Sequence, residues 1–182
     1  REIMQLFSIG LYELNIDGTP KLDAEGKQIP TYNNDDIKQY AKVFTGLGAG
    51  SFKIFEDDDF EPGELPEFGF DFESAAHDVP MIMNEEMHEP GPKYLLRGEV
   101  IPAGQSGMKD IEDAIDNIFN HPNVGPFIGR LLIQRMVTSN PTPDYIRRVA
   151  EVFHNNGQGQ RGDMAAVVKA ILMDPEARAC TD

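Results

Sequence analysis

Hydrophobic residues recur at helical spacing in the second half of the chain. Between Met108 and Val137 they form two apolar faces with three- and four-residue steps, the pattern of amphipathic helices. The first face contains Ile111, Ile115, Ile118 and Phe119, and the second contains Val124, Phe127, Ile128, Leu131, Leu132 and Met136. His121-Pro122 separates them, because a proline pushes the residue before it out of the α region. We therefore expect a helix, a sharp His-Pro corner and a second helix packed back against the first.

Two further helices are expected beyond this pair. Thr142-Pro143-Asp144 has the order of an N-cap, a proline at the first helical position and an acidic residue. Asp163 is the expected N-cap of the last helix, and Asp174-Pro175 is expected to end it. Their apolar faces contain Ile146, Val149, Ala150 and Phe153 in one helix, and Met164, Val167, Val168, Ile171 and Leu172 in the other. The pattern thus predicts four helices between about residues 108 and 173.

The N-terminal part is less regular. Residues 3–7 already have a helical rhythm, so we expect the chain to start within a helix and to be the C-terminal piece of a longer protein. Asp17-Gly18 is a hairpin signal, which favours Leu11–Leu14 pairing with Ile29–Tyr32. Asn33 or Asn34 is a good N-cap for a helix reaching about residue 46.

Residues 51–107 indicate long loops with short strands. Phe68, Phe70 and Phe72 alternate, as do Met81 and Met83, and two apolar runs flank Arg97-Gly98-Glu99 as in a hairpin. The fold class expected is mainly α: a helical bundle-like domain with a small β-hairpin element and long irregular loops. Residues 1–182 form one domain in this interpretation, with a helix and loop-rich part (1–107) and a helical part (108–182).

Composition excludes several classes of protein. The 182 residues have a net charge of -15, which disfavours binding to nucleic acids and to anionic membranes. No stretch is apolar enough for membrane insertion. The single Cys180 excludes an intramolecular disulfide and a cysteine-based zinc site. Four scattered histidines do not supply the ligand set of a transition metal, so we expect no bound metal and no cofactor.

Several short motifs resemble binding sites but lack the required context. Gly46, Gly48 and Gly50 follow a helix, whereas a nucleotide-binding glycine loop follows a strand. His88-Glu89 resembles the start of a zinc-protease motif, but Pro90, Gly91 and Pro92 forbid the helix that this motif needs. The acidic turns at residues 15–25 lack the closing Glu of a calcium loop. The acidic run at 56–64 indicates a solvated loop, with a weak cation site as the alternative.

The best candidate site residues lie in the loop around His88. His88, Glu89 and Lys93 stand together in a Pro/Gly-rich loop, where functional groups are often held by a rigid scaffold. His121 lies at the corner, where an imidazole N–H at the end of the first helix can bond a free carbonyl. His121 therefore has a structural interpretation, which we prefer, and a functional one.

Several longer stretches resemble a bacterial family known as domain of unknown function 1800. They are the opening REIMQLFSIGLYELNIDG, the segment IPTYNNDDIKQYAKVFTG, the H-x4-K loop with LLRGEVIPAGQ, and HPNVGPFIGRLLIQRMVTSNPTPDYIRRVAEVF. The resemblance covers nearly the whole chain and implies no assigned activity. It implies an extracytoplasmic (periplasmic or secreted) location, because many members carry export signals. The motif positions that it marks are Arg1, Glu2, His88, Lys93, His121, Pro122 and Arg130, and Glu89 stands where an Asp is common.

Two functions follow as alternatives. The first is a helical binding or assembly module of an exported bacterial protein, with an unknown protein or small molecule as partner. The second is a hydrolase-type enzyme with a site around His88, Glu89 and Lys93, completed by residues outside this chain. The binding residues expected are Glu2, His88, Glu89, Lys93, His121 and Arg130.

Overall fold

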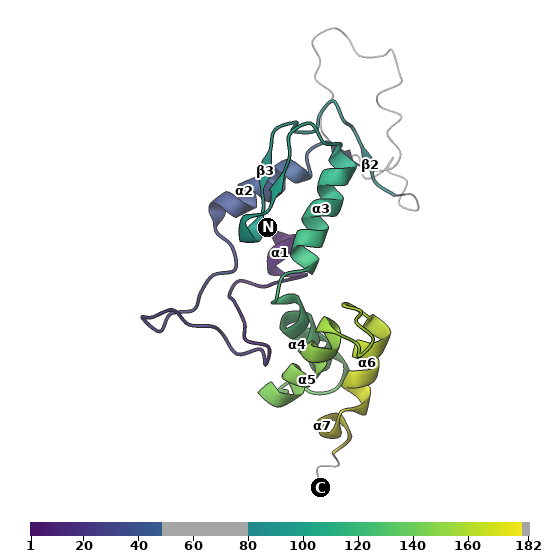
Figure 1. The fold of residues 1–182 in the computed structure, drawn as a ribbon. Coiled ribbons are helices and arrows are strands. Elements are labelled where there is room, and N and C mark those ends of the chain that lie inside the picture. Colours follow the sequence, from purple (N-terminus) through teal and green to yellow (C-terminus); the bar gives the residue numbers. More distant parts are fainter. Residues whose placement is uncertain (49–79, 180–182) are drawn as a thin grey trace, which may run out of the picture.

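The computed structural model of the chain describes residues 1–48 and 80–179. Its seven described α-helices are α1 (Glu2–Gln5), α2 (Asn34–Val43), α3 (Gly107–Phe119), α4 (Val124–Met136), α5 (Pro143–His154), α6 (Met164–Met173) and α7 (Pro175–Arg178). A 3-10 turn, η2 (Leu96–Gly98), and four short strands accompany them: β1 (Leu47–Gly48), β2 (Ile82–Met83), β3 (Lys93–Tyr94) and β4 (Val100–Ile101). The fold is therefore mainly α, as predicted (Figure 1).

The helix starts follow the capping residues that the sequence contains. Asn33 accepts bonds from the Asp35 and Asp36 amides, and the Asp36 carboxylate bonds the Asn33 amide in return, which completes a capping box. Ser106, Thr142 and Asp163 each accept a backbone N–H from the first turn of α3, α5 and α6. The predicted starts of these helices are confirmed, because capping depends on residues within one turn.

Antiparallel pairs form both small sheets. In the β3–β4 hairpin, Lys93 pairs with Ile101 and Tyr94 with Val100, around the turn expected at Arg97-Gly98-Glu99. Strand β2 pairs with β1, which joins the region of Met83 to the end of α2. Isolated bridges such as Tyr12 to Pro30 confirm the pairing of the two predicted N-terminal segments. The expected strand at Phe68–Phe72 and the acidic run at 56–64 lie outside the described residues.

The packing of α3 differs from the prediction. The helix α4 packs on α5 and α5 on α6, whereas α3 packs on α2 rather than back against α4 (Figure 1). The buried residues of α3 are Gly107, Asp110, Ile111, Ala114, Asn117 and Ile118. Ile115 and Phe119, which the periodicity placed on the core face, are 47% and 38% exposed. The buried face is rotated because Asp110 and Asn117 bond groups on other elements.

The buried apolar side chains form one connected cluster. It contains Met4 and Ile9 near the N-terminus, Ile118 in α3 and Ile171 in α6, so it reaches from one end of the described chain to the other. In the described ranges, no helix has both the length and the apolar character needed to cross a membrane.

Candidate functional site

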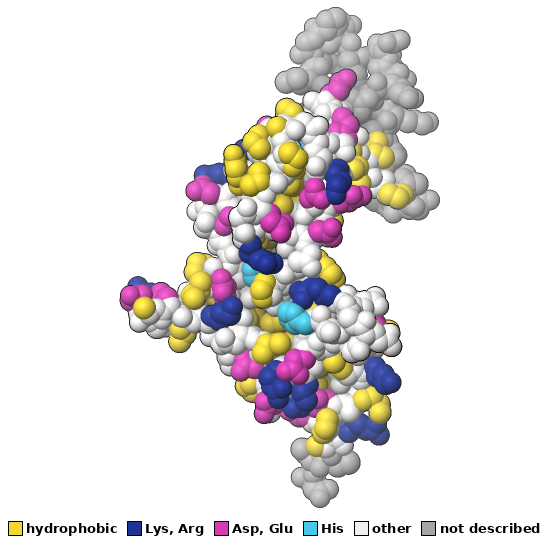
Figure 2. Space-filling view, viewed as in Figure 1, with side chains coloured by type: hydrophobic (Ala, Val, Ile, Leu, Met, Phe, Trp, Pro, Cys, Tyr) yellow, Lys and Arg dark blue, Asp and Glu magenta, His cyan; other side chains and the backbone are white. Residues whose placement is uncertain are grey.

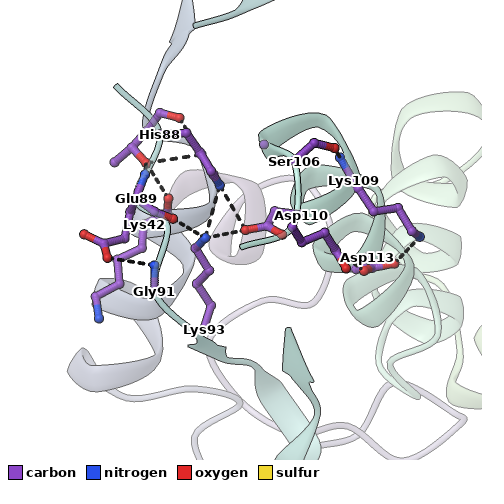
Figure 3. A network of polar contacts seen from close by, with 12 residues as sticks. Lys42, His88, Glu89, Gly91, Lys93, Ser106, Lys109, Asp110 and Asp113 are labelled. Carbon is purple, nitrogen blue, oxygen red and sulfur yellow. Dashed lines mark hydrogen bonds and ion pairs between the residues drawn. The ribbon is translucent and has the colours of Figure 1, made fainter. Parts of the chain in front are cut away.

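Three titratable side chains meet beneath the loop that follows β2 (Figure 3). His88 Nε2 lies 3.0 Å from Asp110 Oδ2 and 3.1 Å from Lys93 Nζ. Lys93 Nζ also donates to Asp110 Oδ2 and to the Glu89 carbonyl. His88 belongs to the loop, Lys93 to β3 and Asp110 to the first turn of α3. We call these three side chains the His88 cluster.

Hydrogen bonds to the residues that follow α2 fix the loop that carries His88. The Thr45 hydroxyl accepts the Glu89 amide at 2.8 Å, and the Gly46 carbonyl accepts the Asn84 amide at 2.8 Å. Gly46 has φ +80° and lies so close to the Asn84 carbonyl that no side chain fits there. Gly46, the first glycine after α2, thus permits a close approach of two backbone segments.

The hydrogen-bond partners define where the protons of the cluster lie. His88 Nδ1 lies 2.9 Å from the Thr45 carbonyl, which can only accept, so Nδ1 carries a proton. A lysine ammonium has three N–H donors. Its three neighbours here are the Glu89 carbonyl, Asp110 Oδ2 and His88 Nε2. Nε2 has a single lone pair, which accepts the Lys93 N–H, and the same ammonium donates to Oδ2.

The cluster is excluded from solvent. Lys93 is 1% exposed, Asp110 0% and His88 6%. Asp110 Oδ1 is buried and has no hydrogen-bond partner among the described residues. Burying charged groups costs free energy that one partner rarely offsets in full, and almost all buried polar atoms are paired. This orphan oxygen therefore requires an explanation.

The structure brings together two of the predicted site residues and leaves the others apart. His88 and Lys93 are in contact. The Glu89 side chain bonds the Gly91 amide at 3.1 Å within the loop and contributes only its carbonyl to the cluster. Glu2 on α1 and Arg130 on α4 are exposed. His121 follows the far end of α3, so the helix length separates it from Asp110 by about 15 Å.

His121 makes a different contact from the one expected. Its Nδ1 accepts the Asn123 backbone N–H at 3.1 Å, so it caps the start of α4 instead of donating to the end of α3. Burial, together with the nearby positive charge of Arg97, lowers the pKa of His121 below its usual 6.5. The unprotonated Nδ1 that this hydrogen bond needs is thus the favoured form.

Arginines bond the free carbonyls at the end of α3. Arg161 donates to the Phe119 carbonyl at 2.9 Å and to the His121 carbonyl at 2.9 Å. It also bonds His154 Nδ1 at 2.7 Å, and its guanidinium lies 5.0 Å from the centre of the Phe153 ring. Arg97 bonds the Asn120 carbonyl at 3.0 Å. This role of Arg161 was not predicted from the sequence, because Arg161 belongs to a polar loop about 40 residues from its carbonyl partners.

Asp110 was not among the site residues predicted from the sequence. Its spacing contained a signal: Asp110, Ala114, Asn117 and Ile118 lie at steps of four, three and one, and so on one helical face. A carboxylate on an apolar face indicates a buried partner.

A pocket of about 350 Å³ lies between the β3–β4 hairpin and the outer side of α3. Its apolar lining residues are Leu95, Val100 and Ile101, and its polar ones are Glu99, Asp113, Asp116, Asn117 and Asn120. Lys109 pairs with Asp113, whose pKa is lowered chiefly by that contact. Within residues 1–48 and 80–179, no group of three or more His, Cys, Asp or Glu side chains is arranged to hold a metal ion.

The described residues thus form a mainly helical protein with a buried His-Lys-Asp cluster and, beside it, a small hairpin and a polar pocket. The chain belongs to the family described as "Protein of unknown function (DUF1800)", which matches residues 1–182. The predicted family is thereby confirmed. No curated protein matches the chain. No solved structure matches it either.

Proposed function

We propose that this chain is a binding module that holds a protein partner on the outer face of the β3–β4 hairpin. The observation that carries the proposal is a pair of exposed apolar residues directly opposite each other in the hairpin. Tyr94 and Val100 are 56% and 54% exposed, although both are large and apolar. Figure 2 shows hydrophobic side chains gathered over this hairpin. Such groups on a monomer often mark an interaction site.

The adjoining pocket suggests the chemistry of the partner. Val100 lines both the hairpin face and the pocket, so the two surfaces are continuous. The carboxylates of Glu99 and Asp116 line the polar side, and the whole chain has a net charge of -15. A partner segment with apolar residues and a lysine or arginine would match this surface in shape and charge.

Burial of the His88 cluster favours this function over catalysis. A substrate must touch the groups that act on it. The three side chains are excluded from solvent and join three elements, which is the arrangement of a structural support. The hydrolase alternative stays a prediction. Activity profiling of the full-length protein, with His88→Ala as the control, would test it.

The binding proposal is tested by comparing variants of the full-length protein. We expect Tyr94→Ser with Val100→Ser to lose a partner that the wild-type protein retains in cross-linked cell extracts. Leu172→Ser is the matched control, because Leu172 is equally apolar and exposed but lies on α6. Equal recovery of the partner by all three proteins, or the absence of any partner and of self-association in the wild type, would contradict the proposal.

We also propose a periplasmic or secreted location. It is supported by the family alone, whose members often carry export signals. Fractionation of cells that produce the full-length protein would test it, and recovery only in the cytoplasm would refute it.

A further inference from the structure

We propose that Lys93 and Asp110 join covalently, through a side-chain amide (isopeptide) bond between Lys93 Nζ and Asp110 Cγ, and that His88 carries the proton. The inference rests on the geometry of the His88 cluster and is independent of the proposed binding surface. It makes the cluster a modification site that the protein builds by itself.

The first requirement is contact between an amine and a carboxyl group away from water. Lys93 Nζ touches Asp110 Oδ2, and both side chains are fully buried. Burial disfavours separated charges, and moving one proton from the ammonium to the carboxylate makes both groups neutral without changing the total charge. A neutral amine next to a neutral carboxylic acid is the reactive pair for amide formation.

The second requirement is a group that transfers a proton between the two. His88 Nε2 lies 3.1 Å from Nζ and 3.0 Å from Oδ2, so it reaches both the nucleophile and the leaving oxygen. The Thr45 carbonyl holds the Nδ1 proton and leaves Nε2 free to accept one. Imidazole is well suited to this exchange because its ordinary pKa lies near neutrality.

The reaction balances without any other reagent. The Nζ lone pair attacks Cγ and forms the C–N bond, and one amine proton passes to His88 Nε2. That proton then moves to Oδ2, the C–Oδ2 bond breaks, and Oδ2 leaves as water. Ammonium and carboxylate thus become one amide and one water molecule, with no oxidation or reduction, and His88 returns to its starting form.

The orphan oxygen supports this assignment. In the ionised pair, Oδ1 is a carboxylate oxygen buried with no partner among the described residues. After the reaction the same atom is the carbonyl oxygen of a neutral amide, which costs less to leave unpaired than part of a full negative charge. The product would tie β3 to the first turn of α3.

Intact mass spectrometry of the full chain tests the proposal directly. We expect the purified protein to be lighter than its sequence by one water molecule, even after denaturation. After tryptic digestion, the peptide 54–97, uncleaved at Lys93, should be joined to the peptide 110–130 as one branched species. An unshifted mass with two separate peptides would overturn the proposal.

Three controls make the result specific. Asp17-Gly18 could also lose water by forming a cyclic imide, so a mass loss that maps to Asp17 counts against the proposal. Asp110→Asn keeps the shape of the side chain but replaces the leaving oxygen with nitrogen. This variant should therefore be lighter than its sequence by one ammonia molecule instead of one water molecule. Lys93→Arg should restore the full sequence mass.

The role of His88 has its own readout. In His88→Ala the branched peptide should accumulate more slowly after refolding than in the wild type, followed by mass at successive times. An unchanged time course would remove His88 from the reaction while leaving the bond itself established by the wild-type mass.

Discussion

Arg161 bonds the end of α3 more extensively than His121 does. Its guanidinium donates to two backbone carbonyls and to His154, whereas His121 accepts one backbone N–H. We expect Arg161→Ala to lower the free energy of unfolding by about 2 kcal/mol and His121→Ala by about 1 kcal/mol. Urea unfolding of both variants measures the difference. A larger loss for His121→Ala would mean that the corner depends on the imidazole after all.

The two histidines near this corner predict a dependence of stability on pH. Burial lowers the pKa of both His121 and His154 below 6.5, with Arg97 adding to the effect at the first and Arg161 at the second. The unfolded chain therefore takes up protons first as the pH falls, so the stability is complete well above pH 6.5 and declines as the pH falls through 6.5. The thermal midpoint should drop between about pH 7.5 and 5.5.

A double variant isolates this effect. His121→Asn with His154→Asn keeps an acceptor in place of each Nδ1 but cannot titrate. Its thermal midpoint should change less over the same pH range than that of the wild type. An identical decline in both proteins would assign the pH dependence to other groups.

At the residue scale, the sequence predicted contacts within one turn and missed those between distant segments. Asn33, Thr142 and Asp163 cap helices as expected, because each partner lies two or three residues away. His88 and Lys93 were placed in one site because they share a loop. Asp110 reaches them only through the packing of α3, which sequence spacing does not define.

Among the elements, α4 and α5 approach closely through glycines. Gly125 and Gly129 are both buried and lie one turn apart on α4. A Cβ at Gly125 would meet His154 at 2.7 Å, and one at Gly129 would meet Val149 at 3.1 Å. This glycine face explains why α4 packs against α5 rather than against α3.

Gly129→Leu should therefore separate the two helices. We expect a loss of about 2 kcal/mol in unfolding free energy, because a bulky side chain has no space against Val149. Arg130→Leu is the matched control on the exposed side of the same helix and should change stability by about 0.5 kcal/mol or less. Calorimetry of the two variants tests the contrast, and similar midpoints for both would contradict the proposed close contact.

The periodicity predicted the helices themselves but not their partners. Both sides of α3 and α4 carry apolar residues, so the pattern alone did not distinguish a face that meets α2 from one that meets α4. The residues that determine which helices pack together are polar or small. Asp110 and Asn117 bond other elements, and Gly125 and Gly129 admit α5.

Across the whole molecule, the N-terminal segment links the parts of the fold. Met4 and Ile9 enter the core. Gly10, with φ +74°, fits against Phe127 of α4, and Gly18, with φ +76°, lies against Ile146 of α5. The side chain of Asn123 connects this segment to the His121-Pro122 corner through three hydrogen bonds. Its amide donates to the Ile9 and Tyr12 carbonyls at 2.8 Å, and its oxygen accepts the Leu14 N–H at 2.9 Å.

Asn123→Ala should therefore destabilise the whole chain more than any exposed asparagine would. The substitution leaves three backbone groups of the N-terminal segment without their partner. Only the bond to Ile9 is fully buried and the other two are partly open to water, so we expect a loss of about 2 kcal/mol in the free energy of unfolding, within the about 1–3 kcal/mol that an unpaired buried group costs. Hydrogen exchange should quicken at the Leu14 amide first, since that amide loses its acceptor. Asn120→Ala is the control, because among the described residues the exposed Asn120 side chain bonds only the Asp116 carbonyl of α3. Similar losses for the two variants, with no change in exchange at Leu14, would show that the N-terminal segment is held by its apolar contacts and not by Asn123.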